Sequence, residues 1–214
     1  MTTPIPYAHR MHYKLTPSDY AALHTRLSAA VPGRAAAVHT LRFASYRFTN
    51  RWTQNAAENL RFSLHYYDND PTYLQLVRQQ GEEYTYTMVA EAECRALLSG
   101  DTDWLLGRSN PVLQDFYECL TGQMLLPQVM MTCRREIYRL SNLDLWVALD
   151  TDIRTSLEHM KFLDPEQLAL ETAEQEGQYL MELSYSDTIP DNILCILEET
   201  APRRQLLAAT ALPA

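Results

Sequence analysis

Lysine is almost absent from this chain of 214 residues: 18 residues are lysine or arginine, and only Lys14 and Lys161 are lysines. Chemistry that needs several lysines in one pocket is therefore excluded. Aspartate and glutamate number 27, so the net charge is 18 − 27 = −9. A field of that sign repels nucleic acids and anionic lipids unless a local basic site overrides it. We expect no nucleic-acid partner.

Several signatures of common enzymes are missing as well. The six glycines never lie close enough for a phosphate-binding loop or a dinucleotide fingerprint, and the zinc-protease, serine-hydrolase and EF-hand motifs do not occur. The four cysteines form no CxxC pair, and the N-terminus shows no basic start followed by an apolar stretch. These features favour reduced, buried thiols in a cytoplasmic protein. No apolar run approaches the ~20 residues of a membrane span, so we expect none.

The N-terminal third alternates between strand and helix patterns. Residues 8–15 alternate as a strand does, and the polar face consists of Arg10, His12 and Lys14. The segment 16–19 predicts a helix start, because Thr16 suits the N-cap and Pro17 suits the first helical position. Residues 59–67 alternate again and place Arg61, Ser63 and His65 opposite an apolar stripe.

The remaining patterns define the fold class. Strands are predicted at 38–43, 72–79, 83–90, 127–139, 143–151 and 178–186, with turns at 68–71, 80–82 and 141–142. Residues 91–124 lack alternation and predict two or three short helices, one of them starting at Asn110-Pro111. A last amphipathic helix is expected from Pro190. We predict one α+β domain over 1–214, with a largely antiparallel sheet that can close into a β-barrel and with flanking and inserted helices.

Polar side chains recur opposite the apolar stripes of several strands. Around residue 133 that face holds either Met131, Cys133 and Arg135 or Thr132, Arg134 and Glu136, and later in the chain Glu182 lies beside Ser184. A solvated outer face and the polar interior of a closed barrel give the same pattern. The pairs at 68/70 and 101/103 are interpreted as turns and caps, whereas Asp150-x-Asp152 stays open as a metal pair.

The chain resembles the VTC domain of polyphosphate polymerases, members of the CYTH or triphosphate-tunnel superfamily. The matching stretches run in family order over nearly the whole chain: Arg10–Leu15, Leu64–Asp70, Leu97–Leu106, Leu113–Tyr117, Pro127–Tyr138, Leu149–Ser156 and Met181–Tyr185. The resemblance implies an antiparallel tunnel lined by lysines and arginines around a phosphate chain. Active members would transfer a nucleotide γ-phosphate to polyphosphate with Mn²⁺ or Mg²⁺.

Compared with the family pattern, most of the cationic lining is lost. His12 stands where the resemblance places an acidic residue, and Ser63-Leu64-His65 replaces an Arg-x-Arg. Other lining positions fall at Gln79, Thr87, Trp146 and Ser184, and the closing Ser-Lys-Tyr is replaced around 208–210. Arg10, Lys14, Arg135 and Glu182 are retained, and Arg61 can cover part of the loss at Ser63. Each charge-assisted donor to a phosphate contributes ~2–4 kcal/mol to catalysis, so these losses together predict a degenerate site.

Three hypotheses follow from the resemblance and the losses. The first is a non-catalytic module that binds a protein partner or an anion, with Arg10, Lys14, Arg61, His65 and Arg135 as candidate phosphate-binding residues. The second is an active polyphosphate polymerase or triphosphatase that acts on polyphosphate or a nucleoside triphosphate. Its catalytic candidates are Lys14 and Arg135, and Glu182 would hold the divalent metal. The third is a tunnel adapted by Trp146 and Cys133 to a less charged ligand. No cofactor is assigned under the first hypothesis.

Overall fold

The computed structural model describes residues 9–45, 60–81, 83–122, 124–140, 145–164, 171–172, 179–186 and 189. These residues form two compact units. Unit 1 comprises Met1–Ala36, Cys133–Ile153 and Thr172–Ala214, and unit 2 comprises Ala37–Thr132 and Arg154–Glu171. The predicted helix from Pro190, the turn at 141–142 and the segment 208–210 lie outside the described residues. No helix in the described part has the length and apolar character needed to cross a bilayer.

Unit 1 is built on antiparallel strands with one covering helix. β1 (His9–Leu15) pairs with β9 (Tyr179–Tyr185), and β9 pairs with β7 (Leu145–Ser156). The helix α1 (Pro17–Ala30) starts at a capping box, in which the Thr16 hydroxyl accepts from the Asp19 amide and the Asp19 carboxylate accepts from Thr16. Leu23 and Leu27 of α1 are buried in a cluster with apolar side chains of these strands. One sheet face of unit 1 is therefore a conventional apolar core.

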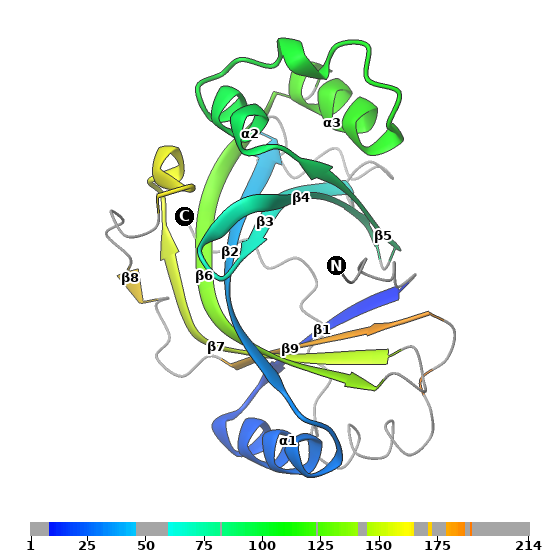
Figure 1. Ribbon diagram of the computed structural model, residues 1–214, viewed down its shortest axis with the longest axis vertical. Helices are drawn as coiled ribbons and strands as arrows, with labels where there is room; N and C mark the ends of the chain where they lie inside the picture. Colours follow the sequence, from blue (N-terminus) through cyan, green and yellow to red (C-terminus); the bar gives the residue numbers. More distant parts are fainter. Residues whose placement is uncertain are drawn as a thin grey trace, which may run out of the picture. The chain divides into compact units, whose positions relative to one another are not determined.

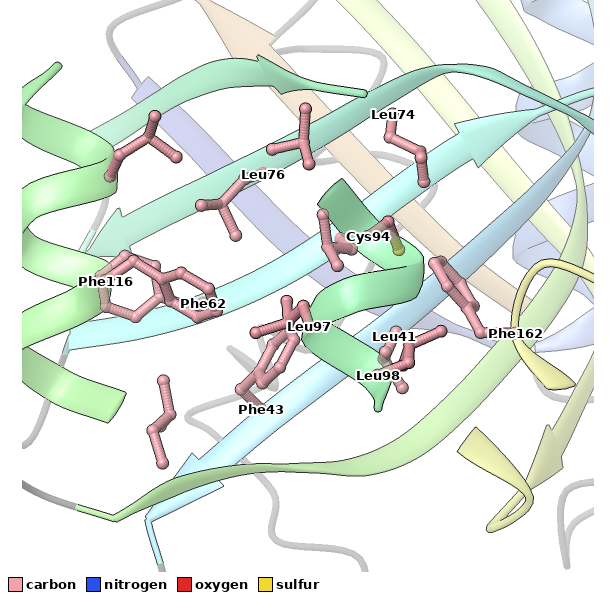
Figure 2. Packing of buried hydrophobic residues seen from close by; sticks show 14 of the residues in the cluster. Leu41, Phe43, Phe62, Leu74, Leu76, Cys94, Leu97, Leu98, Phe116 and Phe162 are labelled. Carbon is pink, nitrogen blue, oxygen red and sulfur yellow. The ribbon is translucent and has the colours of Figure 1, made fainter. Parts of the chain in front are cut away.

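Unit 2 contains four consecutive antiparallel strands and the helical insert. β2 (Arg34–Ser45), β3 (Leu60–Tyr67), β4 (Asp70–Gln80) and β5 (Glu83–Val89) pair in chain order. The insert holds α2 (Glu91–Leu98), the 3₁₀ turn η3 (Asp103–Leu105) and α3 (Pro111–Gly122). Figure 2 shows that apolar side chains of the strands and of α2 and α3 meet on one side of this sheet, where Phe62 and Phe116 contact each other. Short helices therefore occupy 91–98 and 111–122, as the lack of alternation over 91–124 predicts.

The remaining elements include strands that belong to both units. β6 (Leu125–Leu140) and β7, like β2, have residues in each unit. The short elements η5 (His159–Lys161) and β8 (Glu171–Thr172) follow β7. Figure 1 shows the helices beside the strands of their own units, with α1 in unit 1 and α2 and α3 in unit 2. The predicted α+β class with antiparallel strands is confirmed.

One turn differs from its prediction. The turn between β3 and β4 uses only Asp68 and Asn69, which adopt positive φ angles of 54° and 57°, a conformation that asparagine and aspartate tolerate better than most residues. The Asp68 carboxylate also accepts from the Ala37 amide and fixes the turn to β2. Asp70 and Pro71, which the sequence pattern assigns to the turn, already belong to β4.

Candidate functional site

The sheet of unit 1 has a second face, and this face carries buried charge. On β1, side chains alternate so that Arg10, His12 and Lys14 lie opposite the residues that pack with α1. In the register of β1 with β9, His12 lies across from Glu182, and Arg10 lies across from Ser184. Glu182 in turn lies across from Ala148 of β7, two residues from Asp150. Antiparallel pairing thus brings polar positions from three strands together.

Glu182 accepts contacts from two arginines. Its Oε1 lies 2.8 Å from Nε of Arg10, and its Oε2 lies 3.1 Å from Nη1 of Arg135. The hydroxyl of Ser184 donates to Oε1 at 3.3 Å. The side chain of Glu182 is only 3% exposed. Hydrogen bonds from these three donors therefore replace the water that would solvate its carboxylate in the unfolded chain.

Arg135 joins Glu182 to a second carboxylate. Its Nε donates to Oδ1 of Asp150 and its Nη2 donates to Oδ2, both at 2.7 Å. This bidentate arginine–carboxylate geometry gives the strongest type of side-chain ion pair. We call Arg10, Arg135, Asp150 and Glu182 the charge cluster. Two positive and two negative side chains give the charge cluster a formal charge of zero.

The ionisation states of the charge cluster follow from these contacts. Burial acts to raise the pKa of Glu182, but the positive charges of Arg10 and Arg135 hold that pKa well below its ordinary value. Burial acts to lower the pKa of Arg135, and the carboxylates of Asp150 and Glu182 more than reverse the effect. Both groups are therefore charged at neutral pH, and each is the reason that the other stays ionised.

Two aromatic side chains border the charge cluster. The guanidinium carbon of Arg10 lies 6.0 Å from the centroid of the Trp146 ring, at the outer limit of a cation–π contact. Nε2 of His12 lies 3.6 Å from Oε2 of Glu182, and the His12 side chain is 36% exposed. His12 is thus a more exposed neighbour of the charge cluster, whose own members are largely buried.

The structure brings together only some of the residues singled out in the sequence. Arg10 and Arg135 both contact Glu182. Lys14 lies on β1, as Arg10 does, but its side chain is exposed. Arg61 and His65 belong to β3 in unit 2. The ring nitrogens of His65 lie 2.7 Å from the Ser63 hydroxyl and 3.0 Å from the Thr40 hydroxyl, so the imidazole takes part in a local hydrogen-bonded group.

The structure distinguishes the two residue sets that the sequence allows for the polar face around residue 133. Cys133 and Arg135 are buried, whereas Arg134 between them is exposed. Burial raises the pKa of the Cys133 thiol to about 12, with a further contribution from Asp150. The thiol therefore stays protonated at neutral pH, and Cys133 acts as a small buried side chain rather than a nucleophile.

The two carboxylates of the charge cluster do not fit a divalent metal ion. Mn²⁺ and Mg²⁺ take several oxygen ligands at once, but the oxygens of Glu182 and Asp150 already accept from arginine. Among the described residues, no three His, Cys, Asp or Glu side chains are grouped so that they could hold an ion. Asp152, the other half of the open aspartate pair, is exposed and has a positive φ of 50°.

Asp150 is the functional residue that sequence reasoning placed least well. The sequence shows a carboxylate ending the apolar run Val147–Leu149, and such an acid in a buried strand needs a cationic partner. The partner, Arg135, is 15 residues earlier on the neighbouring strand β6. A search for arginine–carboxylate pairs across this predicted hairpin could have found it.

The comparisons with known proteins address the fold. No family model and no curated protein matches the chain. A solved structure of a proposed adenylate cyclase from Bacillus halodurans is similar, with a TM-score of 0.57 and 11% identity over 93% of each chain. A proposed adenylyl cyclase from Hippeastrum with a dominant triphosphatase activity gives a TM-score of 0.54 and 14% identity, over 90% of this chain and 85% of that chain. Both similarities are at low sequence identity, and they show that this chain shares the fold of these two proteins.

Proposed function

We propose that this chain is a triphosphate-tunnel-fold domain, related to VTC domains, that no longer catalyses phosphoryl transfer and acts as a non-catalytic binding or interaction module. The observation that carries the proposal is the charge cluster. Two of the three arginines proposed as phosphate-binding candidates, Arg10 and Arg135, each contact a carboxylate of the chain itself. A cluster with no net charge offers a triphosphate little attraction.

Redirecting these arginines to a phosphate chain would be costly. Breaking a buried ion pair leaves an uncompensated charge and typically costs about 3–5 kcal/mol. Arg135 would have to leave Asp150 and Glu182 together, because it contacts both. A triphosphate would also bring several negative charges close to those two carboxylates. Phosphoryl transfer depends on positioning and on neutralising charge, and the charge cluster supplies neither to a substrate.

An active triphosphatase is the second candidate, and one observation favours it. The Hippeastrum protein, whose fold is similar, has a dominant triphosphatase activity. Under this candidate Lys14 and Arg61, both exposed, would contact phosphate and a divalent ion would be required. The lack of a fitting carboxylate set among the described residues argues against it.

The cysteines and the net charge indicate in which compartment and with which class of partner the module would act. Cys94, Cys119 and Cys133 are free thiols and are buried, which fits a reducing compartment such as the cytoplasm. The partner would be a protein or a small ligand rather than nucleic acid, because the net charge of −9 opposes a polyanion.

Turnover assays separate the two candidates. The purified chain is incubated with ATP or tripolyphosphate and Mn²⁺ or Mg²⁺, and phosphate release and polyphosphate formation are measured. The proposal predicts rates equal to those of buffer. Turnover that is lost in Lys14→Ala and Arg61→Gln, while Arg139→Gln at an exposed strand position retains it, would establish the enzyme instead.

A further inference from the structure

One histidine lies among the apolar residues of unit 2. His39 of β2 is two residues from Leu41, and the register with β3 places it across from Tyr66. Leu41 and Tyr66 are buried in the cluster that packs with α2 and α3, and His39 itself is 6% exposed. Its ring stacks on the Tyr66 ring, with centroids 4.6 Å apart and planes inclined by 18°. A side chain that can gain a proton near neutral pH therefore occupies a core position.

The two ring nitrogens of His39 have different surroundings. Nε2 lies 2.6 Å from Oδ1 of Asn69. An amide oxygen only accepts hydrogen bonds, so Nε2 carries the hydrogen of the neutral ring and Nδ1 carries none. Nδ1 is buried, and no hydrogen-bond partner for it occurs among the described residues. A proton added at Nδ1 would place a positive charge and an unpaired donor in the core, which is costly.

The contact between His39 and Asn69 ties the turn after β3 to β2. Asn69 is one of the two residues of that turn, and two further hydrogen bonds complete the attachment. The Asp68 amide donates to the Ala37 carbonyl at 2.9 Å, and the Ala37 amide donates to the Asp68 carboxylate at 3.1 Å. We call these three hydrogen bonds, which join residues 37 and 39 to residues 68 and 69, the turn latch.

Tyr66 is fixed on the other side of the His39 ring. Its hydroxyl donates to the carbonyl of Phe162 at 2.7 Å, and the two rings pack edge to face with centroids 5.1 Å apart. Tyr66 and Phe162 are fully buried, whereas Asn69 is exposed. The ring of His39 can therefore reach water most easily by release of the turn latch.

The strands beside His39 supply no counter-charge for an added proton. Strands β2 and β3 contain no carboxylate, and neither does Leu125–Thr132, the part of the neighbouring strand β6 that belongs to unit 2. Burial raises the pKa of Tyr66, so the ring that stacks on His39 stays neutral. The other ionisable side chains that β2 and β3 contribute to unit 2 lie on the opposite face of the sheet by alternation: Arg42, Arg61, His65 and Tyr67.

The ionisable groups of the turn, of α2 and of the segment around η5 are bound or neutral as well. In the turn, the carboxylates of Asp68 and Asp70 each accept from a backbone amide. Burial raises the pKa of the Cys94 thiol to about 12, so the thiol is uncharged. The carboxylates of α2 and of the segment 158–164 pair with basic side chains: Glu91 and Asp164 with Arg95, Glu93 with Arg108, and Glu158 with Lys161.

We propose that His39 makes the turn latch sensitive to acid: the neutral imidazole keeps the latch closed, and a proton gained at Nδ1 shifts it towards an open state in which the imidazolium reaches water. The open state detaches residues 68 and 69 from β2. The proposal goes beyond the proposed function, because it concerns a conformational change of unit 2 and holds whether or not the chain is catalytic.

The direction of the pH dependence follows from the pKa of His39. Burial lowers this pKa below the ordinary value of 6.5, and the hydrogen bond with Asn69 reverses only part of the effect. The closed state therefore binds the proton less tightly than the open state does. Its stability relative to the open state is complete above about pH 6.5 and falls as the pH decreases from there towards the lower pKa of the closed state.

Hydrogen exchange of the full chain measures the opening of the turn latch. The amides of Ala37 and Asp68 donate in the latch, so both exchange when it opens. From about pH 7.5 to about pH 5.5, we expect their protection, corrected for the pH dependence of intrinsic exchange, to fall by about threefold to tenfold. One proton with an ordinary pKa of about 6.5 limits the change to about tenfold, and ordinary carboxyl groups titrate below this range. A change of less than about twofold would overturn the inference.

Two variants assign the effect to His39. His39→Gln has no titratable group, and its amide can still donate to Asn69, so protection should no longer depend on pH over this range. His159→Gln removes a histidine of unit 2 outside the latch and, as the matched control, should keep the wild-type response. An equal response in His39→Gln, or a lost response in His159→Gln, would contradict the proposal. A titration of the His39 ring in the wild type by nuclear magnetic resonance is independent of the variants, and a midpoint at or above about pH 6.5 would contradict the proposal too.

Discussion

In unit 1 the polar face of the sheet holds a cluster of two arginines and two carboxylates in contact with one another, whereas in unit 2 the polar rows of β2 and β3 place Arg42 and Arg61 beside hydroxyl and imidazole side chains. The first arrangement is buried and electrically neutral, so removing one of its charges would leave another charge uncompensated in the interior. The two arginines of the second are exposed, in a chain of net charge −9. The position of arginines on a sheet therefore says little about ligand binding until their carboxylate partners are known.

The largest effect should come from removing one carboxylate of the charge cluster. Glu182→Gln keeps the shape but removes the negative charge that Arg10 and Arg135 share. We expect the free energy of unfolding to fall by about 3–5 kcal/mol, the usual cost of an uncompensated buried charge. Urea unfolding measures it, with Glu118→Gln on the exposed side of α3 as the control. A loss under about 1 kcal/mol would show that the buried pairs are not charged as described.

The next effect is a dependence on pH that distinguishes unit 1 from unit 2. The pKa of Glu182 is lower in the folded chain than its ordinary value of 4.5, so the stability it contributes is complete above the unfolded value. This stability is lost as the pH falls towards the folded value. The difference in unfolding free energy between the wild type and Glu182→Gln should be constant above about pH 5 and shrink towards about pH 3. A difference that does not change over this range would contradict the assigned ion pairs.

A smaller effect is expected in unit 2, on the polar face of β3, where Ser63 and His65 form side-chain hydrogen bonds. Ser63→Ala removes the hydroxyl that contacts Nε2 of His65 at 2.7 Å. Because both groups are only partly buried, we expect a loss of about 0.5–1.5 kcal/mol in urea unfolding. A loss as large as that of Glu182→Gln would erase the energetic contrast between the two faces.

The smallest effect is expected at an exposed ion pair outside both faces. Nζ of Lys161 lies 3.0 Å from the Glu158 carboxylate, and both side chains are more than 40% exposed. Glu158→Gln should change the unfolding free energy by about 0–0.5 kcal/mol, since solvent and salt screen such pairs. A larger loss that disappears at high salt would show that exposed ion pairs contribute more to the free energy of unfolding than we expect.

The fold was predictable from local patterns to a large extent. The Thr16 cap, the alternation of residues 60–67 and the helix start at Pro111 each depend on neighbours in the sequence, and the structure confirms them. The turn after β3 is shorter than predicted because Asp68 and Asn69 adopt positive φ on their own. Interactions between neighbours in the sequence therefore account for most helices and strands. They also explain why some predicted ends differ from the observed ends by a few residues.

The candidate site was less predictable, because its contacts join distant residues. Arg10 and Glu182 are brought together by the pairing of β1 with β9, and no local pattern reveals that register. Arg135 and Glu182 could be selected as important residues, but the sequence could not show that they contact each other. The same polar alternation that fits a phosphate-binding lining also fits a self-neutralised cluster.

The central claim is that the retained arginines of unit 1 already have their counterions within the chain. The most direct measurement is calorimetric titration of tripolyphosphate into the wild-type chain and into Arg10→Gln at low ionic strength, where attraction between charges is strongest. The account predicts the same weak or undetectable binding for both. Tight binding by the wild type that is lost in Arg10→Gln, with folding retained, would contradict it.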